Sequence, residues 1–496
     1  MESKLYFWGH NCFFLDQTDT FLVTDPWLTP NGAFYGSWFQ YPQNHHLQAE
    51  LINLSKNKQG WIYITHEHQD HFDLDTLSKL DKKTRVVIPC FEDKFLFTQI
   101  QNLGMDCIEV EDGKRINLSD EISIKLLISD IGVDHDSAAV ISTKSFTFFN
   151  QNDCRVFDRL GEISDEIDFY SVQYSGANHH PSCYSNLSSE EKIRISADKV
   201  NSKLNSVAGA IEKLKPRYFI PAAGPAIFPY LDASLSLGKD NIFIHQDYLN
   251  KFFQDLSVTN YLFPRIGEQI SDQTSREPIP APTLQDLDKY KRATKCFWED
   301  MNDDFDSNKL KRAIMKRLDS IKDIDFQCEY SIEFKWGENK GESIFIDLEN
   351  KNISDERINK NKEYLIKSDK KYFKLLYSAR WQDVSLTLRG SAYRNPDEFN
   401  NIVNIFLFSE PENIRYSLLR SLEIPNERIV VNGLDGKDYE INRYCPHQGA
   451  DLCNADVNEK NELVCPRHGW RFNLSKGGID HSGRTSISSK LINREE

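Results

Sequence analysis

The sequence predicts a multidomain protein with an N-terminal α/β domain, a middle α+β region and a C-terminal all-β domain. Its length of 496 residues exceeds what one hydrophobic core usually serves. Strand-like apolar runs fill the first half, a proline-rich connector follows, and a hairpin signal opens the last part. We therefore expect domains at 1–265, 286–420 and 421–496, with a linker at 266–285.

The composition argues against several classes of protein. Hydrophobic residues make up 39% of the chain and aromatic residues 12%, which is enough to build cores. A net charge of −15 argues against a nucleic-acid or membrane surface, because both need a basic face. The N-terminus lacks a signal-peptide pattern, and the 10 cysteines lack dense spacing. We expect a cytoplasmic protein with reduced thiols and no nucleic-acid or membrane partner.

Buried strands are predicted in the N-terminal domain by short apolar runs that end at polar or turn residues. These runs are Phe21–Thr24, Trp61–Thr65, Val86–Ile88 and Phe146–Phe149. A helix is predicted to begin at Ser188, where serine and glutamate form a capping-box signal, and to end at Lys215, which precedes a proline.

The connector is marked by three prolines, Pro278, Pro280 and Pro282. Beyond it, alternating residues at Phe326–Phe334 and Val384–Leu388 predict half-exposed strands. This middle region carries no motif with an evident chemical role. A Gly-Leu-Asp-Gly turn at Gly433 signals a hairpin at the start of the β-rich final domain.

Two Cys-His turns lie in the final domain, Cys445-Pro446-His447 and Cys465-Pro466-Arg467-His468. Each turn offers one thiolate and one imidazole, which suits a [2Fe–2S] cluster with one Cys₂ iron and one His₂ iron. A zinc site is the alternative, because Cys₂His₂ also binds zinc. Zinc fingers usually separate the cysteines from the histidines, so the mixed turns favour the cluster.

The final domain resembles the Rieske [2Fe–2S] family in these two turns. The resemblance implies an all-β fold with Cys445, His447, Cys465 and His468 as ligands of a one-electron relay. The extra cysteine pair of respiratory-complex members is missing, so the domain looks like the oxygenase and ferredoxin branch.

A second metal motif, His66-Glu67-His68-Gln69-Asp70-His71, directly follows a predicted strand. This spacing can bind one metal through His66 and His68 and a second through Asp70 and His71. The motif resembles the metallo-β-lactamase superfamily, which implies an αββα sandwich for the N-terminal domain.

The superfamily resemblance also implies roles for residues outside the loop. Asp25 is placed where members keep an aspartate that braces the metal loop, and His135 is placed as the third ligand of the first metal. Asp153 would bridge both metals, so Asp70 and Asp153 are the predicted catalytic carboxylates.

One ligand of the superfamily pattern is missing. Members place a histidine after the strand that follows the long helix, but that loop reads Pro-Ala-Ala-Gly-Pro at 221–225. The second metal therefore needs a substitute. His245 is the first candidate for this ligand, and the His179–His180 pair is the alternative.

The two motifs together favour iron, since zinc cannot accept the electrons that a cluster supplies. The segment Tyr174–Tyr184 and the Pro-Ala-Ala-Gly-Pro loop resemble the CMP-N-acetylneuraminate hydroxylase family, although the Rieske unit is C-terminal here. The resemblance implies a monooxygenase-type oxidoreductase that uses O₂, dinuclear iron and electrons from an external NADH-dependent reductase or a ferredoxin. The substrate would be a small molecule, and a local basic pocket would suit an anionic one.

Other readings stay open at this stage. Zinc in the dinuclear site would make the chain a metal-dependent hydrolase with a redox-sensing Rieske domain. A degenerate site would leave a non-catalytic electron carrier. Electron transfer also requires the two centres to meet, either within one chain or across a homo-oligomer.

Overall fold

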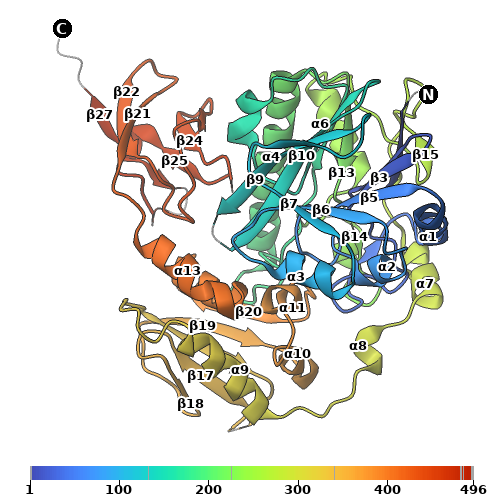
Figure 1. The fold of residues 1–496 in the computed structure, drawn as a ribbon. Helices are drawn as coiled ribbons and strands as arrows, with labels where there is room; N and C mark the ends of the chain where they lie inside the picture. Colours follow the sequence, from blue (N-terminus) through green and yellow to red (C-terminus); the bar gives the residue numbers. More distant parts are fainter. Residues whose placement is uncertain are drawn as a thin grey trace.

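The computed structural model describes residues 3–131, 133–224, 226–238, 240–339, 341–467, 469–480, 483 and 485–492. Figure 1 shows the N-terminal sandwich, the middle region below it and the C-terminal domain beside it. The predicted multidomain fold, with its αββα N-terminal domain and β-rich C-terminal domain, is confirmed.

The N-terminal domain contains two sheets that face each other. The first has the order β15-β1-β2-β3-β5-β6-β7 and the second the order β13-β12-β11-β10-β9-β8. The strands of the first are β1 (Lys4–Gly9), β2 (Cys12–Asp16), β3 (Thr20–Thr24), β5 (Gln59–Tyr63), β6 (Arg85–Pro89), β7 (Cys107–Val110) and β15 (Glu268–Gln269). Those of the second are β8 (Arg115–Asn117), β9 (Ser123–Ile131), β10 (Asp134–Ser142), β11 (Thr147–Asn152), β12 (Phe169–Gln173) and β13 (Tyr218–Ala222).

Hydrophobic clusters hold the four layers together. A core between the sheets joins residues such as Phe13 and Trp61 to Leu126 and Phe148. A second cluster packs the outer helices of the first sheet against it, and a third does the same for the second sheet. These helices are α1 (Leu47–Asn57), α2 (Leu74–Ser78), α3 (Phe95–Asn102), α4 (Ser189–Leu214) and α6 (Gln246–Asp255).

Parallel strands bring the polar loops to one edge of the sandwich. In the first sheet β3 runs parallel to β5, with Thr24 opposite Tyr63. In the second sheet β11, β12 and β13 are parallel. Their carboxyl ends therefore converge, which is where ligands bind in sheets of this kind.

Helix α4 confirms the predicted capping box. The Ser188 hydroxyl accepts the Glu191 N–H, and the Glu191 carboxylate accepts the Ser188 N–H. The helix ends where Lys215 takes a left-handed conformation with φ of 48°. Small elements complete the domain: β4 (Phe39–Gln40), η1 (Phe157–Glu162), β14 (Ala226–Ile227) and α5 (Ala233–Ser236).

Within the expected linker, Glu268 and Gln269 pair with β1 of the sandwich. The helices α7 (Leu284–Ala293) and α8 (Phe297–Asp300) then lead to the middle region, which has the sheet order β18-β17-β16-β19-β20. Its strands are β16 (Tyr330–Lys335), β17 (Ser343–Asp347), β18 (Asn352–Ser354), β19 (Lys362–Lys367) and β20 (Ser391–Asn395). Its helices are α9 (Ser307–Asp319), α10 (Lys370–Leu375), α11 (Trp381–Ser385), α12 (Asn401–Phe408) and α13 (Pro411–Leu422).

The predicted strand at Val384–Leu388 is wrong. Helix α11 covers its beginning, because Trp381 and Val384, three residues apart, face the same core. Leu386 and Leu388 instead contact a separate cluster around Trp38. The alternation thus reflects two cores and not one sheet face.

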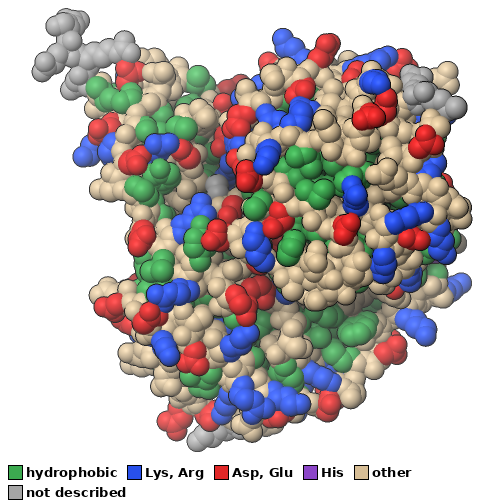
Figure 2. Space-filling model, in the orientation of Figure 1, with side chains coloured by type: hydrophobic (Ala, Val, Ile, Leu, Met, Phe, Trp, Pro, Cys, Tyr) green, Lys and Arg blue, Asp and Glu red, His purple; other side chains and the backbone are tan. Residues whose placement is uncertain are grey.

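The C-terminal domain consists of two small sheets with the orders β21-β22-β27 and β23-β24-β25-β26. Its elements are β21 (Arg428–Asn432), β22 (Asp438–Asn442), β23 (Asp456–Val457), β24 (Glu462–Val464), β25 (Arg471–Asn473), η2 (Leu474–Lys476), β26 (Ile479–Asp480) and β27 (Lys490–Ile492). The described helices include none that is both long and apolar enough to cross a membrane. On the face in Figure 2, acidic and basic side chains are interspersed.

Candidate metal centres

The metal loop at 66–71 is held by a buried carboxylate, as predicted. Asp25 accepts hydrogen bonds from the backbone N–H of Thr65 at 2.8 Å and from the Thr65 hydroxyl at 2.7 Å. It also contacts Nδ1 of His71 at 2.7 Å. This contact directs the other ring nitrogen, Nε2, toward the site.

The structure brings potential ligands together in two overlapping groups. One contains His66, His71 and Asp153, and the other contains His10, Asp70 and His71. His68 lies beside the first group, with its Nδ1 at 2.8 Å from Nε2 of His66. Of the predicted ligands, His66, His68, Asp70, His71 and Asp153 are therefore clustered.

The chemistry of this cluster suits cations. Oδ1 of Asp153 and Nε2 of His71 are buried, have no hydrogen-bond partner and lie 3.5 Å apart. Burial, together with the nearby Asp136, raises the pKa of Asp153 to about 7. Burial alone would lower the pKa of His66, but the surrounding aspartates raise it to about 10. Buried carboxylates of this density need positive charge nearby, so the residues fit a metal site.

His135 does not join the described ligand groups. It lies on β10 opposite Asp130 of β9, and its Nδ1 contacts that carboxylate at 2.7 Å. Its neighbour Asp136 instead reaches Nδ1 of His66 at 3.2 Å. Successive side chains of a strand point to opposite faces, so His135 and Asp136 cannot both turn toward His66. Asp136, and not His135, is the β10 side chain that contacts His66.

His10 lies where the missing histidine was expected. Its carbonyl accepts the N–H of Ala223 at 2.9 Å, within the Pro-Ala-Ala-Gly-Pro loop. Its Nε2 is 3.2 Å from Oδ2 of Asp70. A φ of 51° places His10 in the left-handed region at the β1–β2 turn. A polar Gly-His-Asn triplet inside an apolar run was the sequence signal that could have found it.

The substitutes named from the sequence lie elsewhere. Nε2 of His245 contacts the carbonyl of Ser236 at 2.6 Å, and neither described ligand group includes His245. His179 stacks on Tyr184, and His180 lies near Arg394. Both histidines line a cavity beside the metal loop but belong to neither group.

The middle region also braces the metal loop. Arg380 donates to the carboxylate of Glu67 at 2.6 Å and approaches Asp383 and Glu410. Gln69 donates to Asp383 at 3.1 Å. Burial would raise the pKa of Glu67, but Arg380 lowers it to about 2. A region without a motif of its own thus supports the ligands on either side of Glu67 and Gln69.

The two turns of the C-terminal domain have the same backbone pattern. In the first turn, the N–H of Cys445 donates to the carbonyl of Ala450, and the N–H of Gly449 donates to the carbonyl of Cys445. In the second turn, the N–H of Cys465 donates to the carbonyl of Trp470, and the N–H of Gly469 donates to the carbonyl of Cys465. The thiols of Cys445 and Cys465 are buried, and their mutual hydrogen bond raises the pKa of Cys445. Two thiols that face each other fit one iron of a cluster.

The histidine of the first turn lies in an aromatic setting. The ring of His447 stacks on Trp470 with centroids 4.5 Å apart, and Phe399 of the middle region lies 4.1 Å away. His468, the other predicted histidine ligand, lies outside the described residues.

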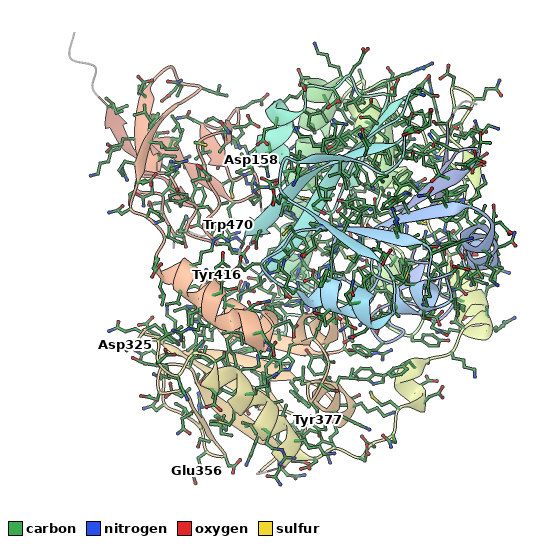
Figure 3. All side chains as sticks on the ribbon, in the orientation of Figure 1. Asp158, Asp325, Glu356, Tyr377, Tyr416 and Trp470 are labelled. Atoms are coloured by element: carbon green, nitrogen blue, oxygen red, sulfur yellow. The ribbon has the colours of Figure 1, made fainter. Side chains whose placement is uncertain are left out.

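One cavity of about 900 Å³ connects the two centres. All three parts of the chain line it, including His66, Asp153, Tyr364, Arg394, His447 and Trp470. Figure 3 shows Trp470 and Asp158 at the boundary between the C-terminal domain and the sandwich. Residues of both predicted sites therefore line one cavity within a single chain.

Reciprocal arginine contacts hold this boundary. Arg155 donates to the carbonyl of Arg467 at 2.8 Å, and Arg467 donates to the carbonyl of Arg155 and to Asp158 at 3.3 Å. Arg155 follows Asp153 by two residues, and Arg467 follows Cys465 by two residues. Two hydrogen bonds between Arg155 and Arg467 thus link the segment that contains Asp153 to the turn that contains Cys465.

Comparisons with known proteins agree with both halves of this arrangement. A model of the Rieske [2Fe-2S] domain matches residues 410–487, and a model of a β-lactamase superfamily domain matches residues 4–154. A Mycobacterium tuberculosis protein named as a Rieske 2Fe-2S iron-sulfur protein is 25% identical over 95% of this chain and 96% of its own length. Cytidine monophosphate-N-acetylneuraminic acid hydroxylase of Danio rerio is 23% identical over 45% of this chain and 38% of its own.

Among solved structures, that of CmlA, a diiron beta-hydroxylase from Streptomyces venezuelae, covers 54% of both chains with 16% identity and a TM-score of 0.37. The two family matches, with the strand orders above, define the class of protein. The chain joins a β-lactamase-superfamily domain to a Rieske [2Fe–2S] domain. The mycobacterial Rieske protein is a relative along nearly its entire length.

The first prediction tests His10 as a ligand. We expect His10→Ala to lower the metal content by about one ion per chain, because it removes one nitrogen from the Asp70 and His71 group. Metal analysis of purified protein measures the loss. His245→Ala is the matched control and should retain the metal. A loss with His245→Ala and none with His10→Ala would contradict the assignment.

The second prediction concerns the brace from the middle region. Arg380→Gln should destabilise the protein by about 3–5 kcal/mol, because it leaves the Glu67 carboxylate buried without its cation. The double variant Glu67→Gln, Arg380→Gln should recover much of this stability in thermal unfolding. Additive losses in the double variant would show that the pair is not coupled.

Proposed function

We propose that this chain is an O₂-activating monooxygenase in which a Rieske cluster passes electrons to two irons that oxidise a small substrate. The observation that carries the proposal is the single cavity lined by residues of both centres. A hydrolase would need no electron donor beside its metals. An electron carrier would need no chamber beside its cluster.

The ligands divide between two ions in this proposal. His66 and His68 belong to the first ion, with Asp136 beside them, and His10, Asp70 and His71 belong to the second. Asp153 lies between the groups, since its Oδ1 faces His71. Iron bound there would supply the redox chemistry that O₂ reduction requires.

The residues around the irons set orientation and charge. Gln173 donates to Asp153 through its side-chain amide, which holds that carboxylate toward the ligand groups. Asp25 orients His71 from behind. Tyr364 and Phe399 of the middle region also line the cavity.

Electrons are the requirement that explains the second domain. Hydroxylation of a C–H bond by O₂ also reduces one oxygen atom to water, which takes two electrons and two protons. A separate reductase or ferredoxin would supply the electrons to the cluster. His447 faces the cavity and stacks on Trp470, so we assign this pair as the exit toward the irons.

Metal analysis tests the function directly. The wild-type chain should contain about four irons, two in the cluster and two in the second centre. Asp153→Ala should reduce the total to about two and abolish oxidation, while the EPR signal of the reduced Rieske cluster persists. Two irons with zinc would favour the hydrolase, and two irons alone would favour the carrier. Full iron content in Asp153→Ala would refute the assignment of Asp153.

The coupling between the centres is tested by Arg467→Met. Hydrogen bonds to a charged group contribute about 1.5–3 kcal/mol, so their loss should lower the docked population of the C-terminal domain about tenfold or more. We expect both metal contents to persist while O₂ reoxidises the anaerobically reduced cluster more slowly. Stopped-flow absorbance measures this rate. Equal rates in Arg467→Met and wild type would contradict transfer through this contact.

A further inference from the structure

One side of the cavity is rich in cations. Lys199 and Lys203 of α4, Arg155 after β11 and Arg394 of β20 all line it, and we call these four residues the basic wall. The two lysines are four residues apart and so lie on one face of α4. The arginines come from the sandwich and from the middle region, so tertiary structure alone assembles the wall.

Neutral oxygens accept the hydrogen bonds of the lysines. Nζ of Lys199 donates to the carbonyl of His180 at 2.9 Å. Nζ of Lys203 donates to the carbonyl of Ser175 at 2.7 Å and to the side-chain oxygen of Gln173. Neutral acceptors of this kind do not compensate the charge of an ammonium group. Each ammonium has three protons, so the described contacts leave donors for a ligand.

The charges of the wall repel one another. Burial, with the guanidinium groups of Arg155 and Arg394, lowers the pKa of Lys199 to about 7. Arg394 pairs with Asp397, and Asp198 also lines the cavity. Burial and Arg155 also lower the pKa of Lys203, and Asp153, which opposes them, belongs to a ligand group. An anion at the basic wall would relieve this repulsion and accept hydrogen bonds from the remaining N–H groups of the lysines.

We propose that the basic wall binds an anionic group of the substrate, a phosphate or a carboxylate. Lys203 contacts Gln173, and Gln173 contacts Asp153, so two hydrogen bonds separate Lys203 from the proposed metal ligand Asp153. The wall would orient the rest of the substrate toward the metals. Calling the anion a substrate group rests on the proposed function, whereas anion binding itself does not.

The competing explanation is structural. Lys199 and Lys203 could serve only to tie the loop at 174–184 to α4, because their acceptors belong to that loop or to the end of β12. A tether would need the ammonium groups but would not respond to anions. The two explanations therefore differ in a binding measurement.

The test titrates inorganic phosphate, and separately acetate, into the full-length protein at constant ionic strength set by sodium chloride. The rise in thermal unfolding midpoint reports binding. Lys199→Gln should weaken the response to the bound anion about tenfold or more. Lys213→Gln, which removes an exposed lysine of the same helix, is the control and should respond as the wild type does. Arg394→Gln repeats the test from another domain if Lys199→Gln does not fold.

The outcomes separate the explanations. A phosphate response that Lys199→Gln loses supports a phosphate group, and a lost acetate response supports a carboxylate. No response in the wild type, or an equal response in Lys199→Gln, overturns the basic wall as an anion site, since binding would then be absent or at the metals. Iron content is measured in parallel, so failure of the oxygenase proposal is seen as missing iron and not as a lost anion response.

Discussion

The arrangement of the metal centre depends on one buried carboxylate, Asp25. It accepts hydrogen bonds from Asn11 at 2.6 Å and from Thr65, and it contacts His71. These contacts join the β1–β2 turn, the end of β3 and the metal loop at a point where burial raises the pKa of Asp25 to about 6. His10 precedes Asn11 in the chain, so the Asp25 carboxylate helps to position both His10 and His71 of the second ligand group. Loss of this link would release histidines from separate strands.

All three parts of the chain line the cavity. The sandwich contributes the proposed metal ligands and the C-terminal domain the proposed cluster loops, while the middle region lines the cavity and braces Glu67 through Arg380. The reciprocal hydrogen bonds of Arg155 and Arg467 join the sandwich to the C-terminal domain beside the two proposed centres. The middle region thus contributes lining residues and a buried cation beside the metal loop.

Local patterns were predicted well, and long-range ones were not. The capping box at Ser188 confirmed the long helix because both partners lie within one turn. At Val384–Leu388 the alternation suggested a strand, yet Trp381 and Val384 share a core as neighbours on a helix. His245 was named as a ligand from its residue type alone, and the fold directs it to Ser236.

The sequence by itself indicated the chemistry proposed for each centre, because His66–His71 and the turns at Cys445 and Cys465 are short loops in which the candidate ligands are closely spaced. Only the tertiary structure decided which residues from separate strands complete them. His10 reaches its ligand group from the turn between the antiparallel strands β1 and β2. Asp136 contacts His66 from the start of β10, where alternate side chains face opposite ways. The meeting of the two centres in one cavity was decided in the same way, by packing between residues more than 300 positions apart, such as Arg155 and Arg467.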